Sequence, residues 1–123
     1  MSYELDRCEE DFLLAWKNAA LHCGPHFFGA KDNDAVIEAT SKRELAVDWA
    51  QVELHADYLS RGIRILLAVV CGFYSATAAE AIFSELALSG RLHPTSWGVG
   101  SRSEVDGIGR RIIADLQATY CGW

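Results

Sequence analysis

The stretch SKRELAVDWAQVELHADYLSRGIRILLAVVCGFY, residues 41–74, decides the fold of this chain. Its apolar side chains recur at alternating steps of four and three residues, which is the spacing of one apolar stripe along a helix. They are Leu45, Trp49, Val52, Ala56, Leu59, Ile63, Leu66, Val70 and Phe73. The spacing predicts one long central helix over about 41–74. A short break near Gly62 is the alternative, because glycine weakens the interior of a helix.

Both ends of this stretch support a helix. Ser41 and Glu44 have the spacing of a capping box, which is typical of a helix start. At the other end, residues 65–79 form a run of 15 residues without a charge. A membrane-spanning helix needs about 20 such residues, so the run predicts a buried core helix and no membrane partner.

Upstream, residues 3–23 carry a second apolar stripe with the same spacing. It comprises Leu5, Cys8, Phe12, Trp16, Ala19 and Cys23. Ser2 is a suitable N-cap, and Gly24 followed by Pro25 is a typical helix end. These signals predict a helix that begins after Ser2 and ends at Cys23.

The remaining segments complete an α-helical protein. Residues 26–40 are compatible with a short helix or a strand, and the pattern does not choose between them. Residues 77–89 and 104–120 have helical spacing, and 91–103 is a loop rich in glycine and serine. We therefore expect an all-α chain, a single domain over 1–123, folded as a bundle of four to five helices.

Charge is distributed unevenly along the chain, whose net charge is −6. Residues 1–60 hold 12 acidic and five basic side chains, a net −7, whereas residues 61–123 hold five acidic and six basic ones, a net +1. An acidic half repels phosphate backbones, so direct nucleic-acid binding is not expected. A protein partner with a basic surface fits this field; a solvated face that only keeps the protein soluble is the alternative.

The segment HCGPHFFG, residues 22–29, holds two histidines and a cysteine, and raises the question of a metal. Zinc sites need four ligands from two separated pairs, and no second pair is present. His22 and Cys23 are neighbours, so on a helix they diverge by about 100°. We expect no metal and no cofactor, and interpret the segment as a helix end covered by phenylalanines. The acidic N-terminus lacks the apolar segment of a secretion signal, so we expect reduced cysteines and a cytoplasmic protein.

No recognisable catalytic motif is present, so we expect a binding protein rather than an enzyme. One alternative is a helical ligand-binding or phosphate-handling protein, in which Arg102, Arg110 and Arg111 bind an anion or His55 carries a phosphate. The segment around His55 is similar in setting to the histidine phosphotransfer bundles, which are also small, helical and often acidic. The chain departs from their pattern, because Asp57, Tyr58 and Leu59 stand where those bundles carry leucine, lysine and glycine.

Small size, acidic asymmetry and helical faces together predict a protein–protein interaction module. Its expected role is to inhibit a partner by occupying that partner's surface, as immunity proteins, antitoxins and phage anti-defence proteins do. The candidate contact residues are Glu9, Glu10, Asp11, Glu44, Asp48, Asp57 and Trp97. Homodimerisation remains open.

Overall fold

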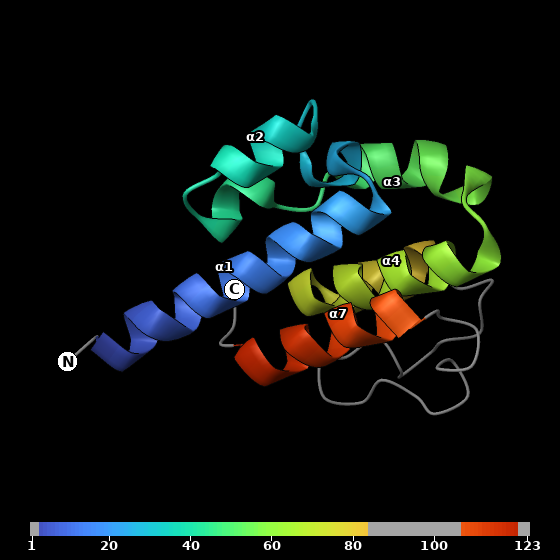
Figure 1. Ribbon diagram of the computed structural model, residues 1–123. Coiled ribbons are helices and arrows are strands. Elements are labelled where there is room, and N and C mark those ends of the chain that lie inside the picture. The colour runs from blue at the N-terminus through green and yellow to red at the C-terminus, as the bar shows by residue number, and fades with distance from the viewer. Residues whose placement is uncertain (1–2, 84–106, 121–123) are drawn as a thin grey trace.

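The computed structural model of the protein describes residues 3–83 and 107–120, and within these residues every regular element is a helix. The α-helices are α1 (Tyr3–Cys23), α2 (Asn33–Glu38), α3 (Trp49–His55), α4 (Arg61–Tyr74), α5 (Ala76–Ile82) and α7 (Gly107–Thr119) (Figure 1). Three short 3₁₀ helices join them: η1 (Pro25–Phe28), η2 (Lys42–Leu45) and η3 (Ala56–Tyr58). The all-α prediction is confirmed for the described residues, but six α-helices exceed the four to five expected.

Helix α1 has the bounds that its stripe and its end signals predict. Phe12, Trp16 and Ala19 are fully buried along one face. Gly24 follows with a φ of 134°, a conformation that glycine adopts without the steric cost of a side chain. The chain then turns into η1, whose Phe27 and Phe28 are fully buried. The interpretation of residues 22–29 as a helix end covered by phenylalanines is confirmed.

The single long helix expected over 41–74 is wrong. The stretch forms η2, α3, η3 and α4, with extended backbone at Ala46 and at Leu59. Two short polar side chains start new helices: the Asp48 carboxylate accepts from the backbone N–H of Gln51 at 3.3 Å, and the Ser60 hydroxyl accepts from that of Ile63 at 3.5 Å. Such caps compete with continuation of the preceding helix. The alternative, a short break near Gly62, is confirmed: the second break falls at Leu59 and Ser60, and Gly62 itself lies inside α4.

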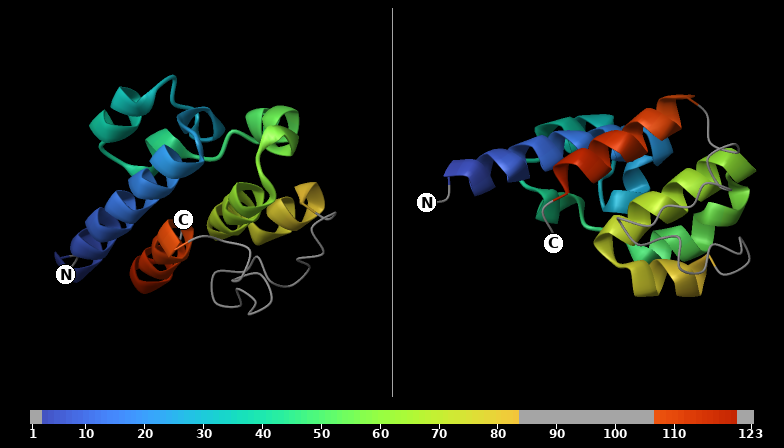
Figure 2. Two further views of the ribbon diagram at one scale, coloured as in Figure 1. Left: turned by 45° about the vertical axis from the view of Figure 1, so that its right-hand side comes forward. Right: turned by 90° about the horizontal axis from the view of Figure 1, so that it is seen from below.

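The apolar spacing of this stretch nevertheless predicts burial well. Leu45, Val52, Ala56, Leu66 and Val70 are buried although they belong to four different elements. Within α4, every residue from 65 to 73 is buried, as expected of a helix that is apolar on all sides. Helix α4 packs against α1, α5 and α7, and it is therefore the central element of the core (Figure 2).

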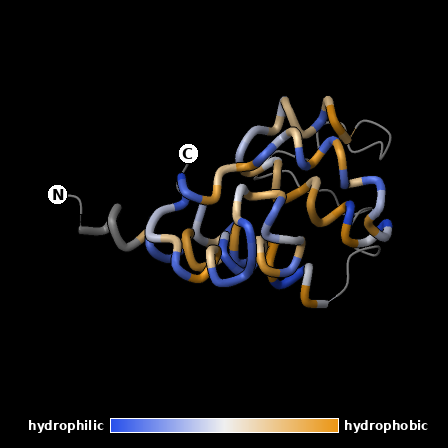
Figure 3. The backbone as a smooth tube through the Cα atoms, turned by 90° about the horizontal axis from the view of Figure 1, so that it is seen from above, coloured by the Kyte–Doolittle hydropathy of each residue, from blue (hydrophilic) through white to orange (hydrophobic). Residues whose placement is uncertain are grey.

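The segment 26–40, left open between helix and strand, contains the short helix α2. Its start is capped by Asp32, whose Oδ1 accepts from the backbone N–H of Ala35 at 2.8 Å. Another short helix, α5, is capped by Ser75, so it begins at Ala76, one residue before the range 77–89 that the spacing predicts. Figure 3 shows hydrophobic and hydrophilic residues alternating along much of the backbone, as amphipathic helices require.

Helices α1 and α7 lie side by side and run in opposite directions (Figures 1 and 2). The Cys8 thiol, near the start of α1, donates to the carbonyl of Thr119 at the end of α7 over 3.4 Å. Tyr120 adds ring contacts with Phe12 and Phe73, at centroid distances of 5.7 and 5.4 Å. Within the described residues, none of the helices has the length and apolarity to span a membrane.

Candidate functional site

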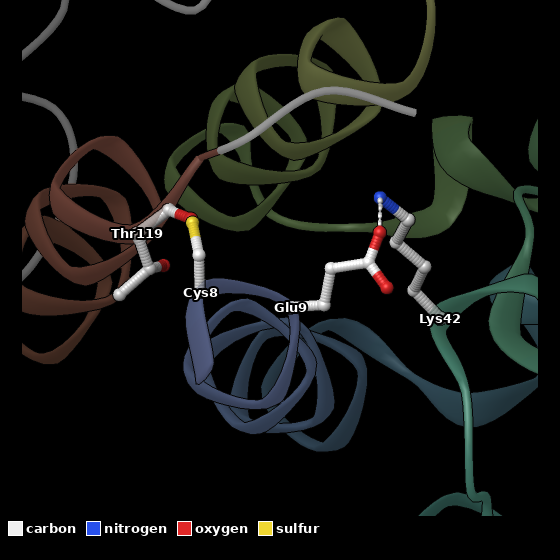
Figure 4. Close-up of polar contacts among 4 residues, drawn as sticks. All are labelled: Cys8, Glu9, Lys42 and Thr119. Atoms are coloured by element: carbon white, nitrogen blue, oxygen red, sulfur yellow. Dashed lines mark hydrogen bonds and ion pairs between the residues drawn. The ribbon is translucent and has the colours of Figure 1, made fainter. Parts of the chain in front are cut away.

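Two acidic residues of α1, Glu9 and Glu10, border a groove that separates this helix from η2. The groove has a volume of about 300 Å³ and is lined by Glu9, Glu10, Leu13, Thr40, Ser41 and Lys42. We call it the acidic groove. Figure 4 shows that Glu9 points toward Lys42 on this side of α1, whereas Cys8 points toward α7 on another.

Lys42 has its carbon chain inside the protein and its charge at the groove. The residue is only 8% exposed, and its Nζ lies 5.6 Å from the centre of the Phe12 ring and 3.9 Å from Glu9 Oε1. A long basic side chain can cover apolar surface in this way while its ammonium meets a carboxylate. Lys42 therefore joins η2 to α1 and compensates one carboxylate of the groove.

Glu44 holds a fixed negative charge beside the same groove. Its Oε2 accepts from the backbone N–H of Thr40 at 2.8 Å, the Thr40 hydroxyl at 2.6 Å and the backbone N–H of Ser41 at 3.0 Å. These hydrogen bonds, the one from the Thr40 hydroxyl first, lower the pKa of Glu44 below its ordinary value. The Glu44 contact of the predicted capping box is confirmed, although it caps a single 3₁₀ turn.

A buried polar contact fixes the position of η2 on α1. The indole Nε1 of Trp16 donates to the carbonyl of Leu45 at 2.8 Å, inside the core. Next along the chain, the backbone N–H of Asp48 donates to the carbonyl of Phe27 at 2.8 Å. The two bonds tie the end of η2 and the residues after it to Trp16 and Phe27, which are themselves buried, so this side of the groove is held in place.

The structure thus brings together some of the predicted contact residues and separates others. Glu9 and Glu10 line the acidic groove, and Glu44 is hydrogen-bonded to two other residues of its lining, Thr40 and Ser41. Asp11 is exposed on α1, and Asp48 is half-buried as the cap of α3. Asp57 lies in η3, directly after α3, with its Oδ1 3.9 Å from Arg64 Nη1.

Two other predicted residues, Trp97 and Arg102, lie outside the described residues. Arg110 and Arg111 are exposed on α7. As neighbours on a helix they point about 100° apart, and Arg111, unlike Arg110, lines the cavity between α1 and α7. The anion site that the three arginines were expected to form therefore stays a prediction.

The histidines and cysteines of the described residues do not assemble into a metal centre, since no three metal-binding side chains gather there. Cys23 is buried, and burial raises the pKa of its thiol to about 12, which keeps it protonated at neutral pH. His55, the last residue of α3, has its ring 5.6 Å from that of His26. Burial, and then the charge of His55, lower the pKa of His26.

Sequence reasoning missed the parts of the groove that come from outside α1. Thr40 and Lys42 have no special pattern around them, and their position depends on the turn between α2 and η2. The only signal was the Ser41–Glu44 spacing, which marks a cap but not what the cap faces.

Comparison of the chain with protein-family models, with curated protein sequences and with solved structures finds no match. The geometry of the molecule is thus the basis for any functional conclusion.

Proposed function

We propose that the protein binds a basic surface of a partner protein through the acidic groove and inhibits the partner by occupying that surface. The observation that supports this most is that Glu9 and Glu10 line one groove and that Glu44 is hydrogen-bonded to the opposite part of its lining. These residues come from two segments more than 30 positions apart in the sequence.

The charge of the groove suits a cationic partner. Lys42 approaches Glu9. Glu10 remains exposed, and the lowered pKa of Glu44 keeps its carboxylate charged. Carboxylates held in fixed positions steer a basic partner during its approach and set the register of the complex. Because Glu44 is already oriented by three hydrogen bonds, little side-chain freedom is lost there on binding.

The groove also offers a short apolar contact. Leu13 is half-buried, packs against the core and lines the groove, while Leu14 beside it is 63% exposed. Protein interfaces combine an apolar centre with a charged rim, and the slow dissociation of a complex comes mainly from the centre. Leu13 is the anchor that the groove provides for an aliphatic part of the partner.

Cross-linked capture tests the binding half of this proposal with two variants of equal charge change. Glu9→Gln/Glu10→Gln alters the groove, and Asp34→Asn/Glu53→Gln alters exposed carboxylates on α2 and α3. We expect the wild type and the α2/α3 variant to capture the same partner, and the groove variant to capture it several-fold less. Equal capture by all three folded proteins would show that the groove is not the contact surface.

The inhibition half needs the purified partner and its own activity. Saturating amounts of the wild-type protein should lower that activity, and the groove variant should lower it only at higher concentration. A partner that stays fully active when saturated would show binding without inhibition.

A further inference from the structure

A second cavity lies at the opposite end of α1, where its last turns face the beginning of α7. Its volume is about 390 Å³, within the range of small-molecule sites. Asn18, Leu21 and His22 line it from α1, and Ile108, Arg111, Ile112 and Asp115 line it from α7. The two helices lie side by side in Figure 2, so the cavity rests on two regular elements.

His22 has an unmet hydrogen bond at this place. Its Nε2 is buried and has no partner, although the ring belongs to a residue that lines the cavity. A neutral imidazole carries one donor and one acceptor nitrogen, and leaving either one buried without a partner costs free energy. Because Nε2 is closed off from water, a bound molecule recovers this cost only when the ring turns toward it.

Arg111 and Asp115 add two opposite charges one helical turn apart. Within residues 3–83 and 107–120, neither side chain forms an ion pair, with the other or with a third residue. Both are exposed, so their charges are open to a ligand. An anion alone would be attracted by Arg111 and repelled by Asp115, which disfavours simple phosphate or sulfate.

The apolar part of the lining completes the pattern. Ile108 is 63% exposed beside the half-buried Leu21, and Ile112 forms a buried part of the wall. An aliphatic group placed here removes apolar surface from water.

From these features we infer that the cavity binds a small zwitterion with an apolar side chain, the chemistry of a free aliphatic amino acid. Arg111 pairs with its carboxylate in the planar geometry that guanidinium groups favour. Asp115 pairs with its ammonium group, and Leu21 and Ile108 cover its side chain. The site is separate from the acidic groove and does not depend on the proposed function.

Calorimetric titration with L-leucine and two truncated analogues tests this inference. Isocaproate lacks the ammonium group of leucine, and isopentylamine lacks its carboxylate. Since each charge-assisted contact is lost separately, we expect both analogues to bind about tenfold more weakly than leucine, or worse. No saturable binding of leucine, or equal binding of all three, would overturn the inference.

Variants on α7 assign the contacts. Arg111→Gln should weaken leucine by about tenfold and should not weaken isopentylamine, because the amine has no carboxylate to lose and is repelled by the guanidinium. Asp115→Asn should do the converse, weakening leucine and sparing isocaproate. Arg110→Gln is the matched control, since this exposed arginine lies outside the cavity lining. Equal effects of the two arginine variants would contradict the assignment, and thermal melts without ligand check that each variant is folded.

Discussion

The two ends of α1 meet their neighbours in opposite ways. Near its start, Glu9 faces Lys42, and Glu44 next to them accepts three hydrogen bonds. Near its end, His22 has a buried nitrogen without a partner, and Arg111 and Asp115 stand unpaired beside it within the described residues. Of these polar side chains, those near the start of α1 thus have partners within the protein, and those near its end have none within the described residues.

The difference separates two kinds of recognition. Polar groups that already have partners gain little from a small molecule. Their fixed charges instead attract a large partner, over a distance that salt limits. Polar groups without partners gain hydrogen bonds when a ligand of matching shape enters, so their effect is local. The same scaffold can therefore present a protein surface and a ligand site without either depending on the other.

The largest expected effect comes from the core that the acidic groove and the second cavity share. Leu66 is fully buried in α4, so Leu66→Ala should lower the free energy of unfolding by about 2–5 kcal/mol. Leu14→Ala is the matched control, because Leu14 is 63% exposed and its truncation leaves no cavity. Urea unfolding of the two variants measures the difference, and equal losses would contradict the position of α4 at the centre.

Trp16→Phe should have the next largest effect, and it should affect the acidic groove and not the second cavity. The change removes the indole donor and leaves the buried carbonyl of Leu45 without a partner, at a cost of about 1–3 kcal/mol. Hydrogen exchange should become faster in η2, which depends on that bond. If exchange increased in α7 instead, the acidic groove would not be held in the way described.

The smallest effect concerns pH at the end of α3. Burial and the charge of His55 lower the folded pKa of His26 below 6.5, so the unfolded chain binds that proton more readily. The resulting contribution of His26 to the free energy of unfolding is fully present above pH 6.5, and it is lost as the pH falls through the lower, folded pKa. Unfolding of the wild type and of His55→Gln on both sides of 6.5 measures it. The variant should lose less on acidification, and an equal loss would remove His55 as a cause.

The sequence predicted elements better than it predicted their continuity. Phe12 and Trp16 in α1, and Leu66 and Val70 in α4, are buried as their spacing indicates, because an apolar stripe faces the core in any helix long enough to show it. The stripe is also maintained across the breaks at Asp48 and Ser60. Spacing alone therefore cannot distinguish one helix from several that face the same core.

The two candidate sites were only partly visible from the sequence. The acidic residues of α1 and the Ser41–Glu44 cap were identifiable, but their meeting depends on how Lys42 and Trp16 dock η2 on α1. The cavity beside His22 depends on α7, which follows more than 80 residues later. Such contacts arise from packing and leave no local pattern.

The most direct test of the acidic groove is the association rate of the protein with its captured partner at low and at high salt. We expect salt to slow association of the wild type and of Asp34→Asn/Glu53→Gln to the same extent. For Glu9→Gln/Glu10→Gln we expect slower association at low salt and a weaker dependence on salt. A groove variant with the association rate and salt dependence of the wild type would show that this groove does not contact the partner.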